Sequence, residues 1–363
     1  MSYVLAALGF AALIILHEAG HFAVAKAVGM RVERFSLFFG PLLVKFRRGE
    51  TEYGIGPIPL GGYVKITGMN PNEELSPEVA PRAYYNQPPW KRIAVILAGP
   101  AVNLVIAFLL IAGIYWSQGE VVTRHGQPIS TVASPLQAPA SSYLKAGDQF
   151  VAVDGKRNLS PDQISNQISS DRCPAATTPG CQGKAPVRLL VRRHGELLAL
   201  SILPRYDAAT RRMRIGFELG ALLRPQGPLG AAGQSIDQMW FVTTTTVSTI
   251  ARLFEPKVRK QVHGIVAGFT VTQQRFAFDT VEALFTLALI SLSLAIINLF
   301  PFLPLDGGHV FWALAEKIRG RRISFAVMER AGVVGFVLIV MLFVIGLSND
   351  ISTLAGGKGF NVR

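Results

Sequence analysis

The chain has 363 residues, of which 50% are hydrophobic and only 16% are charged. Soluble domains carry about 25% charged residues, so this deficit argues against a soluble protein and favours a lipid environment. The formal net charge of +13 could suggest a nucleic-acid partner, but the basic residues are scattered between apolar segments and form no dense cluster with aromatic residues, so we expect no nucleic-acid partner.

Four apolar segments are long enough to cross a bilayer, which takes about 20 residues. The first covers about residues 3–28; it lacks a basic region before it and a small-residue cleavage site after it, so we expect no removable signal peptide. The others cover about residues 93–116, 283–305 and 331–347. Together they predict a polytopic α-helical membrane protein in contact with the lipid bilayer.

Basic residues are frequent in the loop between the first and second segments and in the short loop between the third and fourth. The positive-inside rule makes these loops cytoplasmic, which places the long stretch of about residues 119–280 and both chain ends on the other side. The predicted organisation has residues 1–118 with two membrane helices, 119–206 as a β-rich domain, 207–280 as an amphipathic or linker region, and 281–363 with two further membrane helices.

The outer stretch contains short β-branched or apolar runs separated by turn signals such as Asp154-Gly155 and His194-Gly195, which predict a β-rich domain. The run SSYLKAGDQFVAVDG (141–155) resembles the core of a PDZ domain, a fold that receives an extended peptide at a sheet edge. Two roles remain open for this extracytoplasmic domain. It could select substrates, or it could act as a steric plug.

Two further features of the outer stretch allow alternatives. Cys173 and Cys181 are the only cysteines, too few for a cysteine zinc site or a disulfide scaffold. An extracytoplasmic location favours a disulfide between them, and two free thiols are the alternative. Residues 227–280 fit either an amphipathic helix at the outer surface or a helix packed against the β-rich domain.

The sequence His17-Glu18-Ala19-Gly20-His21 interrupts the first apolar segment. Positions i and i+4 share one face of a helix, so both imidazoles can bind one metal ion, and Glu18 can act as general base on a metal-bound water. Ionisable residues inside a membrane segment are costly unless satisfied, and they usually mark a functional site. The alternative is a histidine pair that hydrogen-bonds to neighbouring helices.

A catalytic zinc site uses three protein ligands and keeps one position open. Asp306 is the only carboxylate between Glu282 and Glu316, and it lies at the end of the third apolar segment. Pro301 and Pro304 break the helix before it, and two glycines after it permit a tight turn. Asp306 is therefore the predicted third ligand, the alternative being an aspartate that caps a helix. Two histidines and one aspartate suit zinc but do not exclude iron or cobalt.

HEAGH in the first segment and NLFPFLPLDGGH (298–309) in the third resemble the site-2 protease family of intramembrane zinc metalloproteases, whose pattern is HExxH with a downstream Asn-x-x-Pro and Leu-Asp-Gly. The PDZ-like insert lies where the family's bacterial sigma-factor-regulating branch with a single PDZ domain has it. One departure is VHGIVAGFTV around Gly264, where the family often has a Ser-Gly-Pro-Val-Gly-Ile type run. Further matches are Phe39-Gly40-Pro41, GGYVKITG from Gly61, Trp90-Lys91-Arg92, Ala98-Gly99-Pro100 and Asn103.

The resemblance implies roles for individual residues. His17, His21 and Asp306 would bind Zn²⁺, and Glu18 would activate the water. Asn298 would bind substrate or steady the developing oxyanion, although it could instead hydrogen-bond to the broken helix. Gly61, Gly62 and Tyr63 would belong to a membrane-associated β-hairpin whose edge pairs with unwound substrate, whereas Phe39-Gly40-Pro41 and Asn103 would be structural.

The expected protein is thus an intramembrane zinc metalloendopeptidase of the bacterial inner membrane. By resemblance, its substrates would be single-span membrane proteins of the anti-sigma-factor type, first trimmed outside the membrane, with remnant signal peptides as a second class. A metal transporter is the rival interpretation, but it would need ligands along a path, and His125, His194 and His263 fall in the outer stretch. An inactive scaffold is another, but it would not need Glu18 between the histidines.

Overall fold

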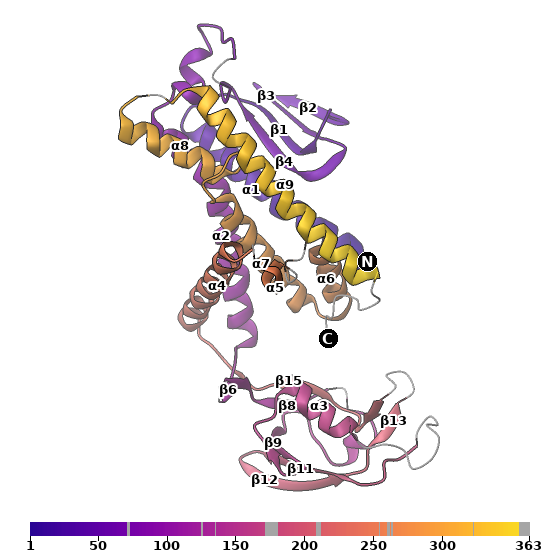
Figure 1. Ribbon diagram of the computed structural model, residues 1–363. Coiled ribbons are helices and arrows are strands. Elements are labelled where there is room, and N and C mark those ends of the chain that lie inside the picture. Colours follow the sequence, from indigo (N-terminus) through magenta and orange to yellow (C-terminus); the bar gives the residue numbers. More distant parts are fainter. Residues whose placement is uncertain are drawn as a thin grey trace. The chain divides into compact units, whose positions relative to one another are not determined.

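The computed structural model describes residues 1–70, 73–124, 126–134, 136–170, 181–207, 212–253, 255–259, 262, 264–321 and 323–355 (Figure 1). The chain divides into two compact units, Met1–Ile114 with Ala232–Arg363, and Tyr115–Ala231. The expected disulfide of Cys181 involves Cys173, which lies outside the described residues.

Four of the described helices are long and apolar enough to cross a membrane. They are α1 (Ser2–Ala27), α2 (Pro89–Gln118), α7 (Thr280–Asn298) and α9 (Phe325–Ala355). Each overlaps one of the four predicted segments, although α7 ends at Asn298 rather than near residue 305 as predicted. The last helix exposes apolar side chains such as Val333 and Val337, which lipid would cover. The structure and composition of these helices therefore agree with a multi-pass membrane protein.

A four-stranded sheet lies between α1 and α2 in the chain, where the sequence predicted a β-hairpin. Its strands are β1 (Val32–Phe39), β2 (Val44–Arg48), β3 (Thr51–Ile55) and β4 (Ile58–Ile66), in the order β2-β3-β1-β4. The central strand β1 runs parallel to β3 and antiparallel to β4. A buried cluster that includes Ala25, Val32, Ile66 and Val95 joins the sheet to α1 and α2. This core fixes the edge strand β4 beside α1.

The remaining helices of this unit pack onto the membrane helices. They are α4 (Pro228–Ala251), α5 (Pro256–Arg259), α6 (Ile265–Phe278) and α8 (Asp306–Arg319), with short 3-10 turns at Ala80–Arg82 and Tyr84–Asn86. The Ser235 hydroxyl of α4 donates to Phe108 O in the interior of α2, 3.1 Å away. Asp350 of α9 accepts the N–H groups at the start of α6 from Gly264 (2.9 Å) and Ala267 (3.0 Å). The stretch left open in the sequence therefore includes a helix that packs along the membrane helix α2.

The second unit is β-rich, as predicted. Its main sheet consists, in spatial order, of β12 (Glu196–Ile202), β11 (Val187–Arg193), β9 (Gln149–Val153), β8 (Ser130–Ala133) and β15 (Glu218–Ala221), and β10 (Lys156–Arg157) pairs with β9. Helix α3 (Pro161–Ser169) begins with a capping box between Ser160 and Gln163, and it buries Ile164 against the sheet. Strand β15 pairs with β8, so the predicted boundary at residue 206 falls inside this unit. The other described strands of this unit form two-stranded pairs: β5 (Glu120–Val121) with β16 (Leu223–Arg224), β6 (Thr123–Arg124) with β7 (Gln127–Pro128), and β13 (Arg205–Asp207) with β14 (Arg212–Arg214).

Candidate metal centre

The two histidines of α1 lie where this helix crosses α2 at close range. His17 and His21 are one helical turn apart, and each is only 7% exposed. A Cβ atom on Gly20 would lie 2.6 Å from Ala98 O, and one on Gly99 would lie 2.3 Å from His21 Nε2. No real side chain tolerates such distances, so the crossing requires glycine at both positions and leaves the space beside Gly99 to the imidazoles.

Asp306 reaches the same place from the other end of the chain. It is the first residue of α8, which starts directly after the proline-containing loop that follows α7. A Cβ atom on Gly307 would lie 2.2 Å from Leu299 O, and one on Gly308 would lie 2.5 Å from Leu303 N. The two glycines therefore let the helix begin against this loop, and the loop aims the Asp306 carboxylate at α1.

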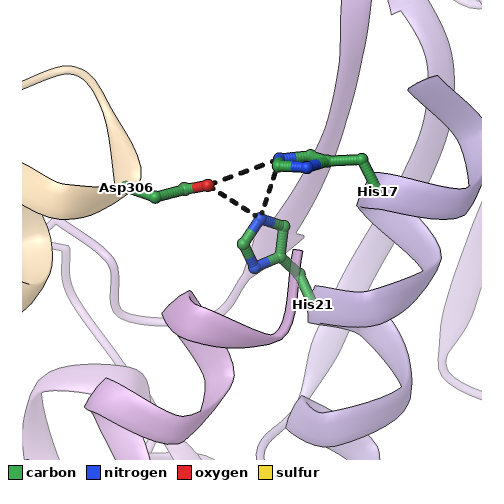
Figure 2. A group of neighbouring side chains, drawn as sticks. All are labelled: His17, His21 and Asp306. Atoms are coloured by element: carbon green, nitrogen blue, oxygen red, sulfur yellow. Dashed lines mark hydrogen bonds and ion pairs between the residues drawn. The ribbon is translucent and has the colours of Figure 1, made fainter. Parts of the chain in front are cut away.

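The three side chains converge on one point (Figure 2). His17 Nε2 and His21 Nε2 are 3.3 Å apart, and Asp306 Oδ2 lies 3.3 Å from each of them. A tetrahedral zinc ion with bonds of about 2.0–2.1 Å holds neighbouring ligand atoms about 3.3 Å apart. Although Asp306 Oδ2 is buried, it makes no well-formed hydrogen bond to any described residue. The donor set, its spacing and this unsatisfied oxygen all fit zinc.

The outer ring nitrogens show how the imidazoles are oriented. His21 Nδ1 lies 2.9 Å from Val95 O, so Nδ1 carries the proton and the lone pair of Nε2 points at the centre. His17 Nδ1 lies 3.1 Å from Asn103 Nδ2, while Asn103 Oδ1 is buried without a hydrogen-bond partner among the described residues. A 180° turn of the Asn103 amide lets Oδ1 accept the His17 Nδ1 proton and satisfies both groups. Each histidine then offers Nε2 to the metal.

The candidate base Glu18 faces the edge strand β4. A Cβ atom on Gly62 would lie 2.8 Å from Glu18 Cγ and 3.0 Å from Ser36 O, so glycine leaves room for the carboxylate. In the described part of the chain β4 pairs only with β1, which leaves its other edge open. Gly62 is thus at the site. By contrast, the Tyr63 hydroxyl accepts a hydrogen bond from Arg34 (2.9 Å), and Gly61 faces the Phe39 ring.

Asn298 is also brought to the centre. It is the last residue of α7, and its Nδ2 lies 3.5 Å from His17 Nε2. His309 is not part of the trio, because its ring packs edge-on against Tyr84 with centroids 6.5 Å apart. The structure therefore unites His17, His21, Asp306 and Asn298 at one point.

Sequence reasoning missed two contacts that support the centre. The family resemblance implies a structural role for Asn103, although an amide inside an apolar span is a signal for function. Arg92 of α2, only 3% exposed, donates to Glu316 of α8 at 2.9 Å and lies over the Tyr85 ring. This buried pair ties the helix that carries Asp306 to α2, and no sequence signal links its two residues.

Comparison with known proteins gives a consistent result. The profile of Peptidase family M50 matches residues 5–342. Zinc metalloprotease Rip1 of Mycobacterium tuberculosis (strain H37Rv) is 33% identical in the aligned region, which covers 87% of this chain and 86% of that protein. Two relatives are each named "Putative zinc metalloprotease". The one from Rhizobium meliloti is 28% identical, covering 95% of this chain and 94% of the relative. The one from Clostridium acetobutylicum is 28% identical, covering 96% of each.

Proposed function

This chain belongs to peptidase family M50, the site-2 proteases, and is a zinc metalloprotease; on that basis we propose that it cuts transmembrane segments of other proteins at the centre formed by His17, His21 and Asp306. The observation that carries the proposal is the mutual 3.3 Å spacing of the three ligand atoms. Two of these atoms come from α1, a helix long and apolar enough to span a membrane. The peptide bond to be cut would thus be reached within the lipid layer.

Each residue at the centre has a distinct task in this proposal. His17, His21 and Asp306 would hold the zinc ion, which would supply a Lewis acid for the scissile carbonyl and for the attacking water. Glu18 takes the proton of the attacking water and passes it to the leaving amine. Asn298 donates its amide N–H to the carbonyl oxygen as negative charge develops, a contribution of about 2.7–4 kcal/mol for donors of this kind.

The open edge of β4 supports a way to present the substrate. The carbonyl groups of a transmembrane helix are already hydrogen-bonded and covered, so the segment to be cut must first unwind. An extended segment can then add to a free strand edge through backbone hydrogen bonds. Because Gly62 of β4 packs against Glu18, a segment paired with this strand passes beside the base.

The substrates in this proposal are single-span membrane proteins, with an anti-sigma factor as the first candidate and remnant signal peptides as the second. Only the family supports these two classes. The basic loops support an inner-membrane protein whose loops after α1 and before α9 are cytoplasmic. The β-rich unit would then lie outside the cytoplasm as a PDZ-like domain that recruits or excludes substrates.

The test uses the purified full chain in detergent with a single-span anti-sigma-type reporter. We expect Glu18→Gln to keep its zinc, measured by elemental analysis, and to lose about 10²–10⁴-fold in cleavage rate. Asp306→Asn should lose zinc and cleavage together, whereas Glu74→Gln, at an exposed position, should match the parent. A Glu18→Gln protein that cuts as fast as the parent would refute this assignment of the base. Zinc transport into vesicles by that variant would revive the transporter interpretation.

A further inference from the structure

A pocket of about 330 Å³ opens in the β-rich unit where its main sheet splits. Strand β8 pairs with β9 through Thr131 and Gln149, and Val132 continues the backbone hydrogen bonds to Gly147 and Asp148, so the two strands separate on the Ser130 side of that pair. The opening reaches Phe150 of β9 and Ile164 of α3. Ligand pockets in proteins begin at about 300 Å³, so this pocket is large enough for a small ligand or head group.

The pocket lining is strongly cationic. Arg124, Lys156, Arg157 and Arg192 all contribute to it, and no aspartate or glutamate is among the described residues that line it. Within the described part of the chain none of the three arginines forms an ion pair, whereas the adjacent Arg193 is paired with Asp148 at 2.6 Å. Uncompensated positive charge around a concave site concentrates anions there.

The same lining contains a buried hydroxyl that lacks a hydrogen-bond partner among the described residues. Ser130 is 3% exposed, and its Oγ atom makes no hydrogen bond to any described residue. Buried polar groups in native proteins are nearly always hydrogen-bonded, so an unpartnered one requires an explanation. An oxygen of an anionic ligand in this pocket would supply the missing bond.

We propose that this pocket binds a phosphate group, supplied by the head group of an anionic phospholipid. The second edge of β9 is already taken by β8 at Gln149 and by β10 at Ala152 and Val153, so an added peptide strand finds little free backbone. Recognition therefore falls to side chains, and the guanidinium fork matches phosphate oxygens in pairs. Leu159 and Leu197 in the lining suit the adjoining carbon atoms of the head group.

The lining residue Arg124 follows the membrane helix α2 closely in the sequence. Only residues 119–122 separate β6 from the end of the membrane helix α2. So short a segment keeps Arg124 within about 20 Å of that helix end. A lipid head group is thus the nearest abundant source of phosphate.

The experiment measures binding to the full-length, zinc-loaded protein in detergent by calorimetry. The probes are six-carbon-chain phosphatidylglycerol, phosphatidylcholine of the same chain length, and inorganic phosphate. We expect saturable binding of phosphatidylglycerol that weakens about tenfold in Arg157→Gln and in Arg192→Gln, since each removes a charged hydrogen bond. Arg205→Gln, at an exposed position outside the lining, should bind as the parent does.

Ser130→Ala separates binding from folding. Because the hydroxyl has no partner among the described residues, its removal should leave the unfolding temperature unchanged or raised while weakening phosphatidylglycerol binding several-fold. Equal affinity for inorganic phosphate would overturn the lipid as the source. Equal affinity for phosphatidylcholine, or binding that survives both pocket arginine substitutions in variants with parental amide protection of β11, would overturn the site itself.

Discussion

The side-chain amide of Asn103 lies 3.1 Å from Nδ1 of His17, the ring nitrogen that does not face Asp306. Nε2 of a neutral imidazole keeps its lone pair only when Nδ1 holds the proton, so an acceptor at position 103 selects the tautomer that binds metal. Asn103→Ala should therefore weaken zinc binding about 10–100-fold. Asn103→Asp, which keeps an acceptor, should lose less.

Competition with a chelator, followed by the zinc content of the protein, measures both Asn103 variants. Ser291→Ala is the matched control, because this hydroxyl donates to the backbone oxygen of Asn103 and leaves the side-chain amide in place. Parental zinc affinity in Asn103→Ala would show that Asn103 does not support metal binding by His17.

Gly99 should be indispensable for a steric reason. An alanine Cβ there would lie 2.3 Å from His21 Nε2, so Gly99→Ala should displace the imidazole and abolish zinc binding. Gly113→Ala lies on the same helix with nothing within 4 Å of its added methyl group. That control should keep its zinc and favour the helix by about 1 kcal/mol. Elemental analysis and thermal unfolding of the two variants give the comparison, and a Gly99→Ala protein with parental zinc would contradict so close a crossing of α1 and α2.

Gly62→Ala should separate metal binding from catalysis. Its Cβ would lie 2.8 Å from Glu18 Cγ, so the base must move, while the other atoms closest to that Cβ belong to Ser36 and Ile14 rather than to a metal ligand. Misplacing a catalytic group by about 1 Å can lower the rate about 10²-fold, and we expect a loss of that order in reporter cleavage with the zinc content unchanged. Loss of zinc in this variant would show that β4 supports the ligands rather than the base.

The β-rich unit should lose stability in acid through one buried pair. Burial alone would raise the pKa of Asp148, but hydrogen bonds from Arg193 and from the Lys145 N–H outweigh it and hold the pKa below its usual range. A carboxyl group with a lowered pKa in the folded state stabilises above its unfolded pKa of about 3.9, and the contribution vanishes as the pH falls through the folded value.

Amide protection of β9 and β11, compared between pH 7 and pH 3 in the full chain, reports this loss. Asp148→Asn should lower the protection already at pH 7 and flatten its dependence on pH. If this variant and the parent respond identically to acid, another group is responsible.

The sequence was sufficient for features that depend on local pattern or on the chemistry of a few residues. Long apolar runs predicted the four membrane helices, and HEAGH together with the carboxylate of Asp306 predicted which groups could bind one metal ion. Contacts that depend on how helices rotate against one another could not be predicted. Helices α1 and α2 are apolar over most of their length, so no periodicity reveals that Asn103 of α2 faces His17 of α1 or that Arg92 of α2 reaches Glu316. The sheet order that leaves β4 at an edge could not be predicted either, because strand pairing is a long-range property.

The separation of the metal ligands along the chain has a consequence for biosynthesis. His17 and His21 emerge from the ribosome early, whereas Asp306 follows only after most of the polypeptide has been made. A nascent chain therefore holds two imidazoles without their carboxylate, and metal affinity that depends on a complete ligand set arrives with late folding. The enzyme would therefore be unable to cleave neighbouring helices while it is being inserted into the membrane.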